Sequence, residues 1–121
     1  MIDEGTDELL AVNLETGSLT VISSDTQGTG PGFNTPREVV LDSAMNRALV
    51  VDDGLLAVDL INGDRNVISG AAVGTGTDFS NPTSVALESA TTALVTDGNL
   101  SVLFSVDLIT GNREIVSGGS T

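Results

Sequence analysis

The sequence predicts an all-β fold, a partial β-propeller with four-stranded antiparallel blades, of which two are full and an N-terminal one is half. The first observation is a repeat: segment 9–14 (LLAVNL) returns as 55–60 (LLAVDL) and again as 103–108 (LFSVDL). The final leucines of these segments are 46 and 48 residues apart. The second observation is that each repeat divides into short β-branched runs separated by Gly, Asn and Asp. Four short strands in a repeat of about 40–50 residues is the pattern of a propeller blade.

The half blade is expected at about residues 8–24. Segment 9–14 is its first strand, Thr16-Gly17 forms the turn, and segment 19–23 (LTVIS) is its second strand. A glycine at such a turn is a hairpin signal because it adopts positive φ without steric cost. These residues predict a two-stranded unit.

The full blades are expected at residues 36–70 and 82–119. Each one combines a short strand after a proline, a nearly continuous apolar strand, a third strand, and a fourth strand that follows a glycine-containing turn. The expected strands are 38–42, 47–52, 55–60 and 65–69 in the first blade and 85–88, 93–97, 102–108 and 113–117 in the second.

Residues 28–36 and 74–82 connect one unit to the next, and their Gly and Pro residues are typical of loops. Phe33 and Phe79 occupy equivalent places in these otherwise polar segments. We expect both rings to fill the seam between neighbouring units, with stacking on a ligand as the alternative.

The core is expected to be aliphatic, because the chain has three Phe and no Tyr or Trp. Strand alternation selects the positions that face inward. The expected core positions are Val39, Leu41, Leu49, Val51, Leu56, Val58 and Leu60 in the first full blade and Val85, Leu87, Leu94, Leu103 and Val106 in the second.

The charge balance excludes two classes of partner. Four basic side chains stand against seventeen acidic ones, which gives a net charge of −13 in 121 residues. Binding to DNA, RNA or an anionic membrane surface depends on Lys and Arg, so we expect no nucleic acid and no membrane as partners. Solubility, a saline habitat or the attraction of cations would account for the charge.

The absence of Cys and His restricts the chemistry further. Disulfides, thiolate nucleophiles and Ser/His/Asp catalysis are not possible, and the commonest general base is missing. We therefore expect no catalytic residues and no enzyme activity. Neither a signal peptide nor an apolar run of membrane-spanning length is recognisable in the sequence, and the compartment stays open.

If a metal binds, Asp52, Asp53 and Asp97 are the expected ligands and Ca²⁺ the expected ion. In a propeller, the turns between second and third strands lie on one face, and these carboxylates stand in such turns. Oxygen ligands are what Ca²⁺ prefers, although no segment matches an EF-hand loop. The alternative is that Asp and Gly end these strands because both tolerate turn conformations.

A paired-carboxylate hydrolase is a further possibility, with Asp42 and Glu88 at the ends of the two first strands. Solvated strand ends are the simpler interpretation. The GTG segments at 28–30 and 74–76 are not phosphate-binding loops, because neither a lysine nor a helix follows them.

Three segments of the first full blade carry a family resemblance: 36–42 (PREVVLD), 48–52 (ALVVD) and 57–63 (AVDLING). They resemble blades of NHL-like and YVTN-like β-propellers, which read roughly as Pro-x-Gly-hydrophobic-Ala-hydrophobic-Asp, then Val-x-Asp, then Val-Asp-x-x-Thr-Gly. Glu38 and Ser84 stand where that pattern has glycine, and the aromatic residues at the blade ends are missing. The resemblance implies a propeller fold and a binding surface, and it implies no reaction.

Two and a half blades are too few to close a ring, which typically takes four to eight. Either the chain is a piece of a longer propeller, or copies cover each other's apolar end faces, and we favour a homo-oligomer, most simply a twofold dimer. The main functional hypothesis is a non-catalytic propeller module that self-associates and acts in binding. The alternatives are a Ca²⁺-dependent propeller or degenerate hydrolase or lactonase-like fragment, and a gene remnant that folds by oligomerising.

Overall fold

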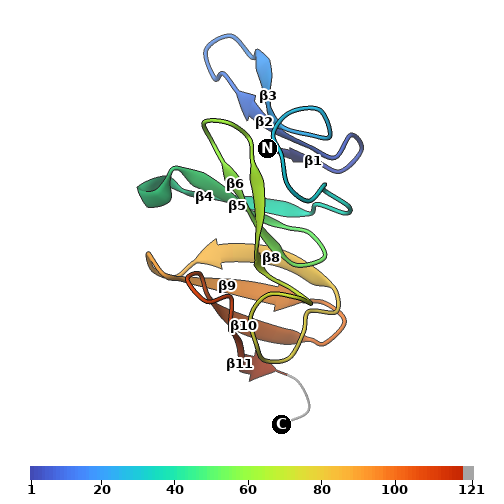
Figure 1. Cartoon of the computed structure of the whole chain (residues 1–121), viewed down its shortest axis with the longest axis vertical. Coiled ribbons are helices and arrows are strands. Elements are labelled where there is room, and N and C mark those ends of the chain that lie inside the picture. The colour runs from blue at the N-terminus through green and yellow to red at the C-terminus, as the bar shows by residue number, and fades with distance from the viewer. Residues whose placement is uncertain (119–121) are drawn as a thin grey trace.

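The computed structural model describes residues 1–118, and it contains three antiparallel sheets stacked along the long axis of the molecule (Figure 1). Sheet A consists of β1 (Ile2–Asp3), β2 (Glu8–Val12) and β3 (Leu19–Ser23). Sheet B consists of β4 (Glu38–Asp42), β5 (Arg47–Val51), β6 (Leu55–Asp59) and β7 (Arg65–Ser69). Sheet C consists of β8 (Pro82–Leu87), β9 (Thr92–Asp97), β10 (Val102–Asp107) and β11 (Arg113–Gly118).

The all-β prediction is confirmed. In residues 1–118 the helical content is limited to one 3-10 turn, Ser43–Met45, where β4 is linked to β5. No helix in this part of the chain has the length and apolar character needed to span a membrane. The strands within each sheet pair in chain order. Residue 119, the last of the range 82–119, lies outside the described residues.

The expectation of two strands in the N-terminal unit is wrong, because sheet A has a third strand, β1. It pairs with β2 through Ile2↔Leu9 and Asp3↔Glu8. The Asp3 carboxylate closes the turn that follows by accepting a hydrogen bond from the Gly5 N–H (2.8 Å). A strand of two residues carries no measurable alternation, which is why the sequence pattern did not indicate it.

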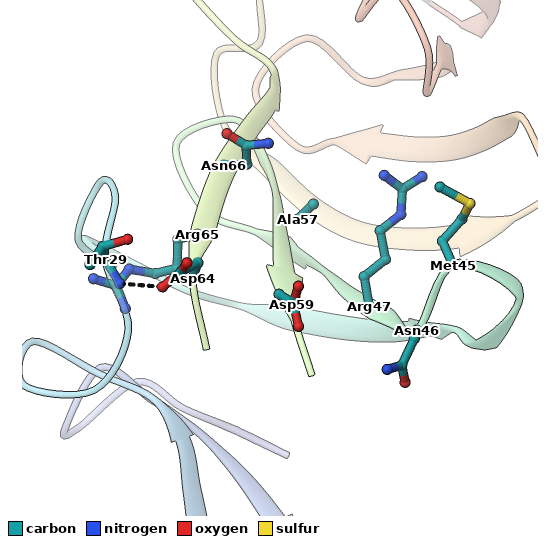
Figure 2. Close-up of a pocket in the computed structure, with 9 residues that line it drawn as sticks. All are labelled: Thr29, Met45, Asn46, Arg47, Ala57, Asp59, Asp64, Arg65 and Asn66. Atoms are coloured by element: carbon teal, nitrogen blue, oxygen red, sulfur yellow. Dashed lines mark hydrogen bonds between the residues drawn. The ribbon is translucent and has the colours of Figure 1, made fainter. Parts of the chain in front are cut away.

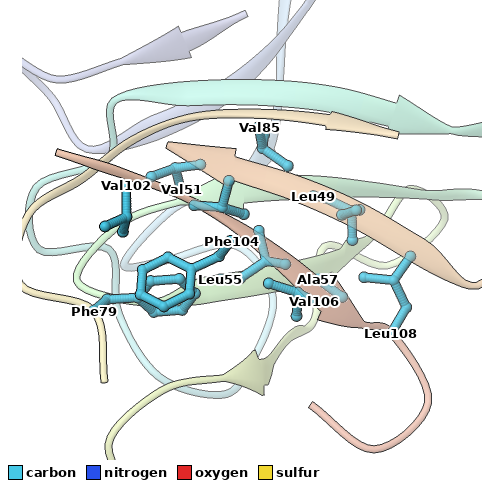
Figure 3. Close-up of a cluster of buried hydrophobic side chains, with 12 residues drawn as sticks. Leu49, Val51, Leu55, Ala57, Phe79, Val85, Val102, Phe104, Val106 and Leu108 are labelled. Carbon is cyan, nitrogen blue, oxygen red and sulfur yellow. The ribbon is translucent and has the colours of Figure 1, made fainter. Parts of the chain in front are cut away.

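Sheet B lies between the other two sheets and is buried on both faces. On β5, Ala48 and Val50 face sheet A, whereas Leu49 and Val51 face sheet C, and all four side chains are fully buried. Two-sided burial explains why residues 48–51 form a continuous apolar run. The larger core lies between sheets B and C (Figure 3), and its buried members are Leu49, Val51, Leu55, Ala57, Phe79, Val85, Ala93, Val95, Val102, Phe104, Val106 and Leu108.

The phenylalanines of the linkers pack as expected. Phe79 meets Phe104 edge to face, with the ring centroids 5.0 Å apart, inside the core between sheets B and C. Phe33 is buried in the smaller core between sheets A and B. Edge-to-face contact is a favoured geometry for aromatic pairs and adds to the burial of apolar area.

The expected core positions are buried in part. Leu49, Val51, Leu56, Val58, Val85 and Val106 are buried. Val39, Leu60 and Leu87 are half-buried beside a core cluster. The expectation is wrong for Leu41, which is 64% exposed, and for Leu94 and Leu103, which are half-buried.

The corrections at these leucines have a common physical cause. Leu94 and Leu103 lie on the face of sheet C that points away from sheet B, where no further sheet covers them. Leu41 lies at the end of β4 beside the part of sheet A that has only short strands. Alternation assigned each residue to a face, but it did not indicate which faces are covered.

Two glycines allow the sheets to approach closely. Gly63 (φ +80°) and Gly111 (φ +79°) stand in the turns before β7 and β11. A Cβ atom at Gly63 would lie 2.1 Å from the Ile22 carbonyl oxygen, and one at Gly111 would lie 2.2 Å from that of Ile68. Each turn therefore presses its backbone against the preceding sheet, and only glycine fits there.

Candidate functional site

Asp52, the first of the predicted metal ligands, closes a loop inside the protein. It stands directly after β5 and is 3% exposed. Its Oδ2 accepts a hydrogen bond from the Asn34 N–H (2.8 Å), and its Oδ1 accepts from the N–H groups of Thr35 (2.9 Å) and Asp53 (2.7 Å). The carboxylate thereby holds the linker between sheets A and B against the end of β5.

Asp97 does the same in sheet C. Its Oδ2 accepts hydrogen bonds from the N–H groups of Ser80 and Asn81, and its Oδ1 accepts from those of Asn81, Asn99 and Leu100, at 2.7–3.1 Å. Burial by itself would raise the pKa of Asp97, but the four N–H donors stabilise the ionised carboxylate and lower the pKa below its usual value. The result is an ionised anchor for the linker between sheets B and C.

Asp53 is exposed and extends the same arrangement. Its two oxygens accept hydrogen bonds from the Asn34 amide (2.7 Å) and the Thr35 hydroxyl (3.1 Å). The structure thus brings Asp52 and Asp53 together on one loop and places Asp97 on the corresponding loop of another sheet. Within residues 1–118 no group of three Asp, Glu, His or Cys side chains is arranged to hold a metal ion. Calcium binding by these residues stays a prediction.

Of the two carboxylates considered as a pair from the sequence, only Asp42 has a side-chain partner among the described residues. Asp42 is 2% exposed, and its Oδ2 accepts a hydrogen bond from Arg47 Nε (2.9 Å) across the β4–β5 pair. Glu88 lies in an exposed turn after β8. The ion pair gives the buried Asp42 its counter-charge.

Sequence reasoning missed two buried arginines that fasten the sheets to one another. Arg65 begins β7 and is 6% exposed. Its Nη1 donates to Ser23 Oγ (2.5 Å) and to the Ser24 carbonyl (2.8 Å), and its Nε donates to the Pro31 carbonyl (2.6 Å). The guanidinium also lies 5.5 Å from the centre of the Phe33 ring. One side chain thus holds both ends of the linker between sheets A and B.

Arg113 repeats this arrangement at the start of β11. Its Nη1 donates to Ser69 Oγ (2.7 Å) and to the Gly70 carbonyl (3.1 Å), its Nε donates to the Thr77 carbonyl (2.8 Å), and it lies 5.3 Å from the Phe79 ring centre. We call each set of arginine, serine and phenylalanine an arginine clamp. The signal was present in the sequence, because Arg65 and Arg113 follow equivalent Asn-Gly and Thr-Gly turns.

A polar pocket of about 410 Å³ opens at one end of sheet B (Figure 2). Its charged groups are engaged within the protein: Arg47 with Asp42, Asp59 with the Ile61 N–H (2.7 Å), and Asp64 with the Thr29 N–H (2.9 Å). Sheet C has a smaller equivalent of about 300 Å³. Its lining residues are Thr92, Ser105, Asp107, Asn112, Arg113 and Glu114.

The remaining arginine, Arg37, is also used structurally. Its Nη1 donates to the carbonyls of Asp52 and Pro82 (both 3.1 Å), so it bridges sheets B and C. All four basic side chains of the protein therefore bind groups of the protein itself. The arginines therefore help to hold the sheets and linkers together.

Two other surfaces are apolar, and both involve sheet A. The first is the outer face of sheet A, which points away from sheet B and carries Met1, Leu10, Val12, Leu19 and Val21. The second is a groove of about 380 Å³ between sheets A and B. The groove is lined by Met1, Leu9, Leu10, Ala11, Val12, Ile22, Val39, Leu41, Ala48 and Leu60.

Comparison with known proteins gives no family for this chain. No family model matches the sequence, and no curated protein matches it either.

Proposed function

We propose that this chain is a non-catalytic repeat module of the β-propeller type that self-associates and acts through binding. The observation that carries the proposal is the outer face of sheet A. Three of its aliphatic side chains are exposed, Leu19 to 59%, Val12 to 41% and Val21 to 38%, whereas Leu10 is buried. Contiguous exposed apolar surface of this kind marks an interaction site.

The repeat supports a propeller type of organisation. Sheets B and C have the same strand order, stack face to face, and bring their first strands together, with the Val85 N–H donating to Glu38 Oε1 (3.1 Å). Each neighbouring pair of sheets is joined by an arginine clamp. A repeat that needs a neighbour to cover its face is typical of such architectures.

The distribution of polar groups supports a binding role without catalysis. A general acid or base has to have an atom free to reach a substrate. The buried acids Asp42, Asp52 and Asp97 are each bonded to an arginine or to backbone N–H groups, and they tie linkers and strands together. Their chemistry is that of structural anchors.

Molar mass in solution tests the proposal. Sedimentation equilibrium across a concentration series should give a mass above 12.3 kDa, most simply twice that value. Interference optics are needed, because the chain has no Tyr or Trp to absorb at the usual wavelength. A folded monomer throughout the series would overturn the proposed self-association.

A further inference from the structure

We infer that the outer face of sheet A is a twofold self-association surface, on which the same face of a second copy packs. The inference rests on the proposed function, because it specifies which surface brings the copies together. It commits to one occupant and one symmetry: sheet A against sheet A.

The register of the strands places four aliphatic residues on this face, and Met1, whose backbone is hydrogen-bonded to that of Leu10, joins them. Leu10 pairs with Val21 and Val12 pairs with Leu19, so each pair points to the same side of the sheet. Leu9, which neighbours Leu10 on β2, points to the opposite side and belongs to the core against sheet B. The face therefore presents the exposed side chains of Met1, Val12, Leu19 and Val21 around the buried Leu10, and none of the five needs a hydrogen-bond partner.

The repeat shows what this face does elsewhere in the molecule. In sheet B the residues equivalent to Leu10 and Val12 are Leu56 and Val58, which are buried against sheet A. In sheet C they are Phe104 and Val106, which are buried against sheet B. The outer face of sheet A is therefore the same kind of surface as two established interfaces, and what it fits is another sheet.

The identity of residue 19 indicates which kind of sheet fits the outer face of sheet A. It occupies the position of Arg65 and Arg113, whose guanidinium groups bind the linker that precedes each sheet. A sheet that packed here in the manner of the internal repeats would bring a linker with carbonyl groups that require an arginine. Leucine at this position instead matches an aliphatic surface that brings no such linker.

The opposite end of the stack supplies a more polar surface, because its Leu94 and Leu103 stand beside two hydroxyl residues. The outer face of sheet C has Thr96 and Ser105 where the buried face of sheet B has Val51 and Ala57. Thr96 forms hydroxyl hydrogen bonds with Thr83 (2.9 Å) and Ser84 (2.6 Å) on this face. These bonds satisfy the Thr96 hydroxyl, but covering the Ser105 hydroxyl with an aliphatic face that offers no partner would cost about 1–3 kcal/mol. Head-to-tail packing is disfavoured by that cost, which the aliphatic pairs Leu10–Val21 and Val12–Leu19 of sheet A do not incur when they pack on a second copy.

The groove extends the apolar surface of the proposed interface. Met1, Leu10 and Val12 belong both to the outer face of sheet A and to the lining of the groove. Leu41, which is 64% exposed, lies on the far side of the groove. A second copy packed on sheet A would thus meet a continuous apolar surface that reaches sheet B.

Cross-linking of single-cysteine variants tests the symmetry, and the absence of Cys from the chain makes the experiment clean. Val12→Cys places a thiol on the outer face of sheet A, and Ser105→Cys places one on the outer face of sheet C. With a short bis-maleimide, V12C should give a dimer linked through residue 12 of both copies. S105C alone should give no linked product, and a mixture of S105C with V12C should give only the product linked through residue 12 of both copies.

The other outcomes overturn the inference in distinguishable ways. A mixed product that joins residue 12 to residue 105 would establish head-to-tail packing. If V12C gives no product while the unmodified protein sediments as a dimer, another surface is the interface and the proposed function stands. If the unmodified protein sediments as a monomer, the proposed self-association fails together with this inference.

Leu19→Arg provides a second readout, because it installs the residue that sheets B and C carry at this position. Two arginines facing each other across a twofold interface should weaken the dimer by roughly tenfold or more in dissociation constant. Ile109→Arg is the matched control, with the same charge change at a residue 79% exposed in a turn of sheet C, and it should leave the constant within about twofold. An unchanged or tighter L19R dimer would overturn the twofold arrangement.

Discussion

At the scale of single residues, buried charged side chains hold the linkers of this protein against its sheets. Asp52 and Asp97 gather the N–H groups of the linkers, and Arg65 and Arg113 gather the carbonyl groups. A loop that crosses between sheets has backbone groups that no strand satisfies, and leaving them unpaired would cost free energy. The charged side chains take the place of strand partners.

Asp97→Asn should lower the free energy of unfolding by about 1–3 kcal/mol at neutral pH, because an amide replaces an acceptor of several N–H groups with a group that also donates. Asp25→Asn, an exposed residue with the same charge change, is the control. Denaturant unfolding followed by far-ultraviolet circular dichroism measures both. Equal stability of D97N and D25N would contradict the anchoring role.

The same carboxylate makes stability depend on pH. The pKa of Asp97 is lower in the folded protein than in the unfolded chain, so its contribution is fully present above the unfolded value of about 3.9 and is lost as pH falls through the folded value. The difference in stability between the unmodified protein and D97N should therefore shrink below about pH 4. A difference that stays constant down to pH 2 would show that ionisation of Asp97 plays no part.

Arg113→Lys keeps the charge but loses the planar fork that reaches Ser69, Gly70 and Thr77. We expect a loss of about 2–4 kcal/mol in the free energy of unfolding, because several buried carbonyl groups lose a charged donor. Glu114→Gln, on the exposed side of the same strand, should change stability by less than about 0.5 kcal/mol. Thermal melts of both variants test the clamp, and an unaltered R113K would refute it.

A calcium titration tests whether the predicted metal ligands bind Ca²⁺. If Asp52, Asp53 and Asp97 bind Ca²⁺, millimolar Ca²⁺ should raise the melting temperature and release heat in calorimetry. The N–H groups already held by Asp52 and Asp97 lead us to expect the same melting temperature in Ca²⁺ and in a chelator. A clear rise with Ca²⁺ would restore the metal hypothesis.

At the scale of strands and sheets, the sequence predicted the existence and order of nearly all elements because each has its own alternation and its own turn signal. The strands expected at 38–42 and 65–69 have those limits in the structure. Alternation could not predict which faces of the sheets are covered by a neighbouring sheet. Leu49 and Leu94 occupy equivalent positions in the repeat, yet one is fully buried and the other half-buried.

The candidate site was less predictable than the fold. The positions of Asp52 and Asp97 after β5 and β9 followed from the pattern. Their distant partners, however, are backbone N–H groups of linkers that lie 16 to 18 residues earlier in the chain. Such contacts depend on how a loop folds back, which has no periodic signature. The clamps join residues more than 40 positions apart for the same reason.

The two equivalent leucines give a matched test of burial. Leu49→Ala should cost about 2–5 kcal/mol, because it opens a cavity in the core between sheets B and C. Leu94→Ala removes the same atoms from a half-buried outer face and should cost less than about 1.5 kcal/mol. The measurement is the free energy of unfolding in denaturant at low protein concentration. Equal losses would mean that the outer face of sheet C is covered in solution.

At the scale of the whole molecule, charge opposes the association that the apolar face favours. Each copy has a net charge of −13, and β1 and β2 place Asp3 opposite Glu8 near the outer face of sheet A. Repulsion between exposed charges weakens when salt screens them, whereas burial of apolar area is not weakened in this way. The balance between the two should therefore depend on ionic strength.

Self-association should tighten between about 0.01 M and 1 M NaCl, as the screening length falls from roughly 30 Å to 3 Å. Sedimentation equilibrium at several salt concentrations measures the dissociation constant. The L19R variant provides the comparison, because it should stay weakly associated at high salt. Dissociation of the unmodified protein by added salt would show that ion pairs, and not the apolar face, hold the copies together.

The arginine clamps also bear on how the chain folds as it is synthesised from its N-terminus. Ser23 and Phe33 emerge early, but the side chain that fixes them, Arg65, is made 42 residues after Ser23. Asp52 and Asp97 can hold these linkers earlier, but the linker after sheet A lacks its clamp until the last strand of sheet B begins, and the linker after sheet B lacks its clamp until Arg113 is made. A ribosome-bound chain that stops short of residue 65 should accordingly leave that first linker more open to protease than a chain long enough for β7 to have left the ribosome.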